Sequence, residues 1–274
     1  MKADAFMDKR WGKEMIHLNN LYLRRGERVI LDGVTIDINP GEHWVILGKN
    51  GSGKTTLLEM ITGYMFPSSG TVDVLGNRFG QCDVREIRKE IGYISQSLLE
   101  KLTLADTVWE VVATGAFAFL RFYQEIPQEV KVQAQQQLEG MGLGHLMHQP
   151  LGSLSQGERK KVLLARSLMA NPKLLIMDEP CAGLDLYERE KFLKELNRLS
   201  QQNMTAIYVT HHIEEITPLF THVALIHEGK VAAAGPKHEV VTSELLSHAY
   251  DLPIEVEWGH ERPWIRVRSQ GDNL

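Results

Sequence analysis

Apolar and polar residues follow two different patterns along the chain. Short apolar runs typical of strands dominate the start and the last third, whereas residues 97–170 show helical periodicity without strand signals. This order predicts an α/β fold with a β-rich start and a helical subdomain inserted over about residues 97–170. Strands are predicted at residues 15–23, 29–31, 34–38, 43–47, 71–75, 91–95, 173–179, 205–210, 222–227 and 230–234, and helices at residues 55–61, 84–90, 128–141, 156–168 and 243–250.

The end of the chain has a strand-like pattern of its own. Residues 254–258 and 264–268 each alternate apolar and polar side chains, and a turn-like segment separates them. This pattern predicts a small hairpin-like appendix over residues 251–274. Its basic and aromatic residues would also suit nucleic acid, but a packed hairpin with one solvated face is the preferred interpretation.

A glycine-rich stretch lies between the predicted strand 43–47 and the predicted helix 55–61. From Gly48 to Thr55 it has a glycine, four free positions and then Gly-Lys-Thr, which is the P-loop pattern. In such a loop the backbone N–H groups and the helix N-terminus cradle phosphates, the lysine reaches the β- and γ-phosphates, and the hydroxyl binds Mg²⁺. The alternative, a glycine-rich turn with a surface lysine, fits the flanking elements less well. The predicted nucleotide-binding residues are Gly48, Asn50, Gly51, Ser52, Gly53, Lys54, Thr55 and Thr56.

Two adjacent acids end the apolar run of residues 173–177. Buried strands rarely end in neighbouring carboxylates for packing reasons alone. Asp178 suits a ligand of Mg²⁺, and Glu179 suits a general base for water. The alternative is that both acids simply end a strand.

Two further strands end in a polar side chain. Gln96 follows the strand 91–95, which we interpret as a central strand, and the carboxyl ends of strands are where α/β sheets hold ligands. A plain surface glutamine is the alternative. His211 follows the strand 205–210, and a single histidine in that place is more often structural than catalytic.

A capping box predicts where the last helix of the inserted segment begins. Ser155 is followed three residues later by Glu158, and an apolar helical pattern continues from there. The simple interpretation is a well-capped helix. A further interpretation is a second anion-binding site, because an exposed helix start with Ser155 and Gly157 presents free N–H groups.

Composition narrows the class of protein. The chain has 274 residues and a net charge of −5, so overall charge gives no support for nucleic-acid binding. Cys82 and Cys181 lie far apart without metal-ligand spacing, which fits a reducing cytoplasm rather than a disulfide framework. No signal-peptide pattern is present at the start, and the apolar patch of residues 108–120 is too short to cross a bilayer. A membrane function would therefore need a second polypeptide.

The motifs together resemble those of an ATP-binding cassette (ABC) ATPase. The resemblance covers residues 14–250 and rests on the P-loop, Gln96, the sequence Leu-Ser-Gln-Gly-Glu, the acidic strand and His211. The segments 41–44, 74–76 and 210–215 further resemble single-cassette bacterial proteins of the YlmA type. The resemblance implies an ABC-type nucleotide-binding domain with an antiparallel N-terminal β subdomain and a mixed or parallel core sheet.

The resemblance also implies a mechanism. Two cassettes would pack head to tail around two ATP molecules, with Ser155 and Gly157 of one chain facing the phosphate cradle of the other. Gln96 would contact Mg²⁺ or the attacking water, Glu179 would polarise that water, and His211 would hold the γ-phosphate. Asp185 would connect the two sites across the dimer.

One position departs from the family pattern. ABC ATPases often place an aromatic residue before the glycine of the first turn, to stack on adenine, and this chain has Arg25 before Gly26. The planar guanidinium could stack on the base, or it could be solvated. ATP remains the expected nucleotide.

Two functions fit the resemblance. The first is the Mg²⁺-dependent ATPase subunit of an ABC transporter, working as a dimer at the cytoplasmic face of the membrane with a separate permease. The second is a soluble ABC ATPase with a regulatory or assembly role and no permease. A nucleotide-binding module without turnover is a third interpretation, which Lys54, Asp178, Glu179 and His211 disfavour.

Overall fold

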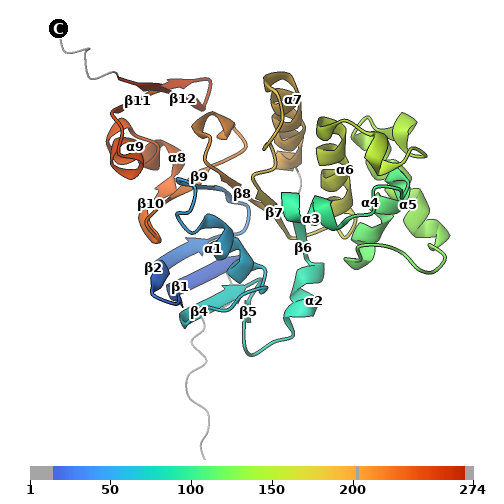
Figure 1. The fold of residues 1–274 in the computed structure, drawn as a ribbon, viewed down its shortest axis with the longest axis horizontal. Coiled ribbons are helices and arrows are strands. Elements are labelled where there is room, and N and C mark those ends of the chain that lie inside the picture. Colours follow the sequence, from blue (N-terminus) through green and yellow to red (C-terminus); the bar gives the residue numbers. More distant parts are fainter. Residues whose placement is uncertain (1–14, 202–203, 269–274) are drawn as a thin grey trace, which may run out of the picture.

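Two β-sheets and a group of helices form the protein (Figure 1). The computed structural model describes residues 15–201 and 204–268. The first sheet is antiparallel and lies at the start of the chain, and the P-loop helix α1 lies between it and the second sheet (Figure 1). Its strands, in spatial order, are β2 (Arg28–Ile38), β1 (Ile16–Arg25), β4 (Ser69–Val74) and β5 (Asn77–Arg78).

The second sheet is mostly parallel and carries the predicted polar strand ends. In spatial order it contains β10 (Lys230–Pro236), β9 (His222–His227), β3 (His43–Leu47), β8 (Thr205–Thr210), β7 (Leu174–Asp178) and β6 (Ile91–Ile94). The strands from β9 to β6 run parallel to one another, and β10 is antiparallel to β9. Because parallel strands end at the same edge, the segments that follow β3, β8, β7 and β6 meet along one line.

The parallel sheet is buried on both faces. In β3, Trp44 and Ile46 belong to the apolar cluster shared with α1 and the antiparallel sheet, while Val45 and Leu47 belong to the cluster shared with the helical part. Successive side chains of a strand point to opposite faces, so a strand covered on both sides reads as a continuous apolar run. This is why the strand 43–47 shows no alternation in the sequence.

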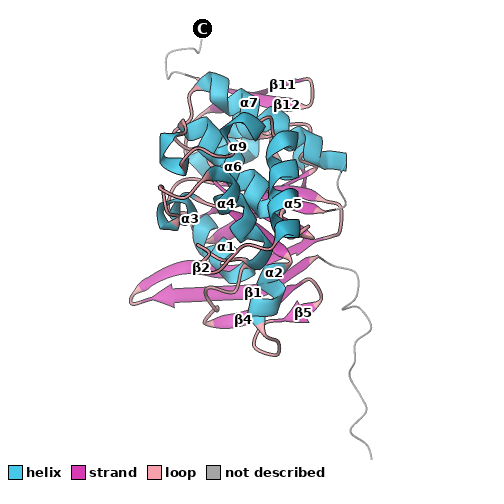
Figure 2. Cartoon of the chain, turned by 90° about the vertical axis from the view of Figure 1, so that its right-hand side faces the viewer, coloured by secondary structure: helices cyan, strands magenta, loops and turns pink. Residues whose placement is uncertain are grey.

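Helices cover the second sheet and fill the inserted segment (Figure 2). The α-helices are α1 (Lys54–Ile61), α2 (Val84–Lys89), α3 (Gln96–Lys101), α4 (Val108–Ala113), α5 (Gln128–Gly140), α6 (Gln156–Leu168), α7 (Leu186–Asn197), α8 (Lys237–Val240) and α9 (Ser243–Tyr250). Short 3-10 turns lie at η1 (Thr114–Phe117), η2 (Gly144–Leu146), η3 (Leu151–Ser153), η4 (Arg198–Gln201) and η5 (Ile213–Glu215). Among the described residues, no helix has the length and apolar character needed to cross a bilayer.

β6 and α7 are two of the features that differ from the expectations. β6, interpreted as a central strand, is an edge strand that pairs only with β7 in the described sheet. Its apolar run reflects cover by helices on its faces, and a sequence run cannot distinguish that cover from a neighbour on each side. Helix α7 was not among the predicted helices, because polar residues dominate it and only Phe192, Leu193 and Leu196 are buried.

The end of the described chain forms a separate hairpin. Strands β11 (Ile254–Gly259) and β12 (Arg262–Val267) pair antiparallel through a turn at His260 and Glu261, both with positive φ. The hairpin lies beside α9 and contacts the first half of α7 through Glu190 (Figure 1). The last predicted residues of the appendix, 269–274, lie outside the described residues.

Candidate nucleotide-binding site

The glycine-rich loop joins β3 to α1 in a tightly packed place. A Cβ atom on Gly48 would come within 2.3 Å of the Ile226 carbonyl oxygen, so no side chain fits there. Gly53 precedes α1 with φ of 107°, a left-handed conformation that favours glycine. The loop backbone is therefore held against β9 on one side and β2 on the other.

Lys54, the P-loop lysine, is buried inside this loop. Its ammonium donates to the carbonyl oxygens of Gly48 at 2.8 Å and Lys49 at 3.0 Å. Burial lowers the pKa of Lys54, and the charges of Glu179 and Asp178 oppose that effect. Within the described part of the chain, the buried Ser52 hydroxyl has no hydrogen-bond partner. An oxygen atom of a ligand would accept the hydrogen bond that this hydroxyl lacks, since a buried polar atom without a partner costs free energy.

The acidic end of β7 faces the loop. Burial, and then the charge of Glu179, raise the pKa of Asp178 to about 6, while Lys54 and the Thr55 hydroxyl oppose the shift. Glu179 has a positive φ of 45°, which is strained for a residue with a side chain. Strain of this kind is typical of functional sites, where the surrounding structure holds it.

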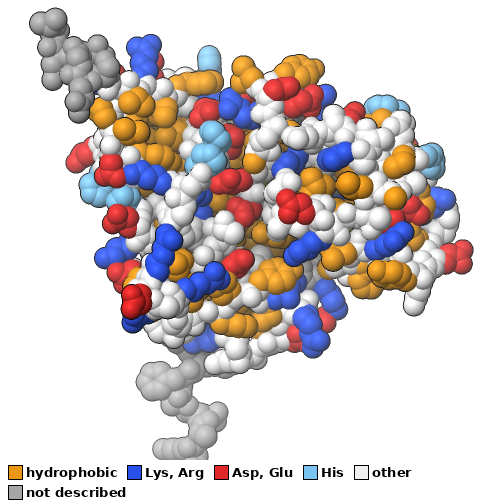
Figure 3. Space-filling model, viewed as in Figure 1, with side chains coloured by type: hydrophobic (Ala, Val, Ile, Leu, Met, Phe, Trp, Pro, Cys, Tyr) orange, Lys and Arg blue, Asp and Glu red, His pale blue; other side chains and the backbone are white. Residues whose placement is uncertain are grey.

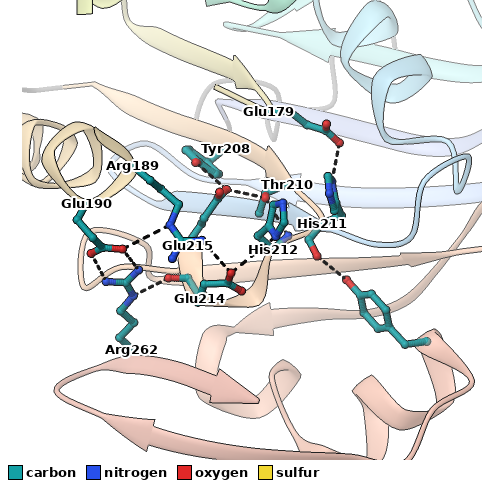
Figure 4. Close-up of polar contacts among 11 residues, drawn as sticks. Glu179, Arg189, Glu190, Tyr208, Thr210, His211, His212, Glu214, Glu215 and Arg262 are labelled. Carbon is teal, nitrogen blue, oxygen red and sulfur yellow. Dashed lines mark hydrogen bonds and ion pairs between the residues drawn. The ribbon is translucent and has the colours of Figure 1, made fainter. Parts of the chain in front are cut away.

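Glu179 and His211 contact each other across adjacent strand ends (Figure 4). His211 Nδ1 lies 3.0 Å from Glu179 Oε1, as expected from the pairing of β7 with β8. The turn after His211 is anchored from the core, because Tyr208 and Thr210 both donate hydroxyl hydrogens to the buried Glu215 carboxylate at 2.8 and 2.6 Å (Figure 4). The histidine that looks structural by itself therefore lies against the predicted general base.

Gln96 begins α3, and its amide meets a buried lysine. Lys160 of α6 is buried and donates to Gln96 Oε1 at 3.3 Å, and burial lowers its pKa. The Gln96 amide also donates to Glu100 at 3.4 Å. Lys160 was not predicted, because a lysine in the polar first turns of a capped helix is normally expected to face solvent. The missed signal is its place beside the apolar run that begins at Val162.

Ser155, Gly157 and Asp185 form a second group, which makes no polar contact with the P-loop in the part of the chain that the structure describes. Ser155 accepts from the Glu158 N–H at 3.3 Å and its own N–H donates to the Glu158 carboxylate at 2.8 Å, so the predicted capping box is present. Gly157, expected at an exposed helix start, is buried instead, and a Cβ on it would lie 2.1 Å from the Glu188 carboxylate. Asp185 caps α7 by accepting from the Glu188 N–H at 2.9 Å. In Figure 1, α6 and α1 lie on opposite sides of β7.

Arg25 lies apart from both groups. It ends β1, is exposed, and donates to the sulfur of Met65 at 3.6 Å, so its place on the antiparallel sheet leaves both interpretations of its role open. On the face drawn in Figure 3, Lys and Arg side chains lie among Asp and Glu rather than in one basic patch. The absence of a nucleic-acid partner stays a prediction.

The sequence matches known proteins over most of its length. The family model described as ABC transporter matches residues 31–182. The uncharacterized ABC transporter ATP-binding protein YlmA of Bacillus subtilis is 39% identical over 92% of this chain and 96% of its own length. The uncharacterized ABC transporter ATP-binding protein YmeB of Lactococcus lactis is 39% identical over 88% of this chain and 94% of its own.

Solved structures agree with the fold. CbiO1 of Clostridium perfringens, described as part of an ABC transporter complex, has a TM-score of 0.74 and 29% identity, covering 86% of this chain and 94% of its own. A dimeric ATP-binding cassette described in a post-hydrolysis state with ADP and Pi has a TM-score of 0.70 and 26% identity, covering 81% of this chain and 98% of its own. The fold class predicted from the motifs is confirmed.

Proposed function

Because this chain belongs to the ABC transporter family of ATP-binding proteins, we propose that it binds and hydrolyses ATP and drives a separate membrane permease. The observation that carries the hydrolytic part is the contact between Glu179 and His211 at the edge of the sheet where the P-loop begins. A general base needs a partner that orients it and a nearby place for the reacting phosphate.

The P-loop residues fit the phosphates of ATP. Lys54 would exchange its two loop carbonyls for the β- and γ-phosphate oxygens, and the Ser52 hydroxyl would gain an acceptor. The free N–H groups at the start of α1 add their partial positive charge. Arg25 is the candidate for stacking on the adenine ring.

The donors beside the P-loop fit Mg²⁺. The Thr55 hydroxyl, the Asp178 carboxylate and the Gln96 amide are the oxygen ligands that Mg²⁺ accepts, and phosphate oxygens would complete the coordination. When bound, the ion neutralises charge that develops on the phosphates. Asp178, with a pKa of about 6, is mostly ionised above neutral pH and so can serve as a ligand.

Hydrolysis is assigned to three side chains. Glu179 takes the proton of the attacking water, and its strained backbone directs the carboxylate toward the strand edge. His211 orients that carboxylate through its ring nitrogen and holds the γ-phosphate. Gln96, supported by Lys160, senses the same phosphate from the neighbouring strand end.

The second group suits a partner cassette through Ser155 and Asp185, which are exposed, whereas Gly157 is buried against the Glu188 carboxylate. Ser155 and Gly157 would bind the γ-phosphate held by another copy of the chain, and Asp185 would connect the two sites. The related cassette described as dimeric with ADP and Pi supports this arrangement. The permease would be a separate chain in the membrane, with this chain bound at its cytoplasmic face, and the description of the relatives as ABC transporter ATP-binding proteins supports a role in transport.

Glu179→Gln tests the assignment of the base. The variant keeps the volume of the side chain but cannot accept a proton, so ATP binding is expected to stay near the parental level while kcat falls by roughly 10²–10⁴-fold. Binding is measured by calorimetry and turnover by phosphate release. Full activity would remove Glu179 from this role.

The same variant tests the permease. Tagged Glu179→Gln protein is recovered with ATP from gently solubilised cells, because blocked turnover retains the closed dimer. A stoichiometric integral membrane partner supports the transporter function. Recovery of the homodimer alone, from the cytosol, would favour the soluble ATPase without a permease.

A further inference from the structure

The C-terminal hairpin is joined to the site by one arginine. Arg262 of β12 forms two hydrogen bonds with the Glu190 carboxylate, at 2.6 and 2.8 Å, and its Nε donates to the Glu214 carbonyl oxygen at 2.5 Å (Figure 4). Glu190 belongs to α7 and Glu214 belongs to η5, the turn that follows His211. One guanidinium therefore holds three segments that are distant in the sequence.

The Arg262 side chain is mostly buried and closely surrounded. The side chain of Arg262 is only 16% exposed, and the ring of Trp264 lies 5.0 Å from its guanidinium carbon. Hydrogen bonding to Glu190 raises the pKa of Arg262, and the same contact lowers the pKa of Glu190. A planar, bidentate pair of this kind imposes both distance and orientation, which a lysine could not.

The η5 turn is held from two sides. From the core, Tyr208 and Thr210 hold the Glu215 carboxylate. From the outside, Arg262 holds the backbone of Glu214, whose carboxylate accepts from Arg189 of α7 at 2.9 Å. Only His212 separates His211 from this turn, so we expect a displacement of the turn to move the ring that contacts Glu179.

We propose that Arg262 is a positioning residue for ATP hydrolysis and that the hairpin is a working part of the ATPase site. Arg262 sets the place of the η5 turn and so the orientation of His211 against Glu179. Through Glu190 it also holds α7, the helix that Asp185 caps. The inference rests on the proposed ATPase function.

The test compares Arg262→Ala with a matched variant of the same hairpin. Arg268→Ala also removes one arginine, but that arginine pairs with Glu255 inside the hairpin at 3.0 Å. We expect Arg262→Ala to lower kcat by about 10–100-fold with KM for ATP within about twofold, because a misplaced catalytic group costs rate rather than binding. Arg268→Ala should keep the parental kcat, and Arg262→Lys should recover only part of the loss.

A double-mutant cycle identifies the route of the effect. If Arg262 acts through His211, adding Arg262→Ala to His211→Ala should lower kcat by less than about twofold, since the two changes remove the same interaction. Two independent effects that multiply would overturn the assignment to His211.

Amide hydrogen exchange gives a readout that needs no turnover. Arg262→Ala should speed exchange at residues 211–216 while β7 and α1 keep parental rates. Parental kcat and parental exchange at residues 211–216 would overturn the inference. A variant that unfolds is replaced by Arg262→Lys in the same measurements. Failure of the proposed function has a different signature, because the parental chain itself would then hydrolyse no ATP.

Discussion

The two groups of predicted site residues differ in how well their polar atoms are satisfied. In the P-loop group, the Ser52 hydroxyl has no partner among the described residues, burial raises the pKa of Asp178 to about 6, and Glu179 has a strained backbone. In the second group, Ser155 and Asp185 each cap a helix and have the hydrogen bonds that capping requires. The first group therefore retains a buried polar atom that a ligand would satisfy, whereas the capping groups of the second are satisfied within the chain.

This difference suggests separate roles within one composite site. Unsatisfied buried groups cost folding free energy and are kept where function needs them. Ser155 and Asp185 at these helix starts are exposed, so they can meet a ligand held by another molecule. The P-loop group would therefore bind ATP within one chain, and the second group would close over ATP from its partner.

The largest expected effect comes from mixing two inactive variants. Lys54→Ala damages the P-loop group, and Ser155→Arg blocks the second group, so each protein alone should lose nearly all turnover. In a head-to-tail heterodimer both defects fall in one site and the other site is intact. An equal mixture should therefore recover up to about a quarter of parental sites, measured as phosphate release.

The control for this experiment is a mixture of Lys54→Ala with Glu179→Gln. Both changes lie in the P-loop group, so every site of the heterodimer has one defect and turnover should stay at background. Recovery in this mixture, or none with Ser155→Arg, would contradict the composite site.

Asp178→Asn should separate stability from function. The folded pKa of Asp178, about 6, lies above its unfolded value, so the folded state binds more protons between pH 4 and 6 and stability falls as pH rises through that range. Without nucleotide or Mg²⁺, the variant should therefore be more stable at pH 7.5 by about 1–3 kcal/mol, yet inactive. Urea unfolding at pH 7.5 and pH 4 measures this, and the gain should vanish at pH 4. An equal gain at both pH values would argue against a titrating Asp178.

Ser155→Ala should have the opposite sign and the smallest size. Loss of the capping hydroxyl is expected to lower the free energy of unfolding by about 1 kcal/mol, equally at both pH values. Ser155→Thr, which keeps a hydroxyl, is the control for urea unfolding. If Ser155→Ala were as stable as the parent, the second group would not be self-satisfied as the structure indicates.

Local motifs predicted much of the fold. The P-loop, the capping box at Ser155 and the acidic end of β7 are contiguous, and their geometry follows from a few neighbouring residues. Helix α9 was predicted with its observed bounds, because a short amphipathic run lies between clear boundaries. Helix α7 was missed because few apolar residues mark its buried face.

By itself, the sequence determined which groups can bind phosphate, cap a helix or end a strand in acid, because those properties depend on residues within one turn or one strand. Only the tertiary structure decided that β6 is an edge strand, that His211 contacts Glu179, and that Arg262 holds the turn beside them. These features depend on strand order and on contacts between distant segments. The local sequence pattern does not reveal them, because the free energy of such contacts is gained only when the whole chain folds.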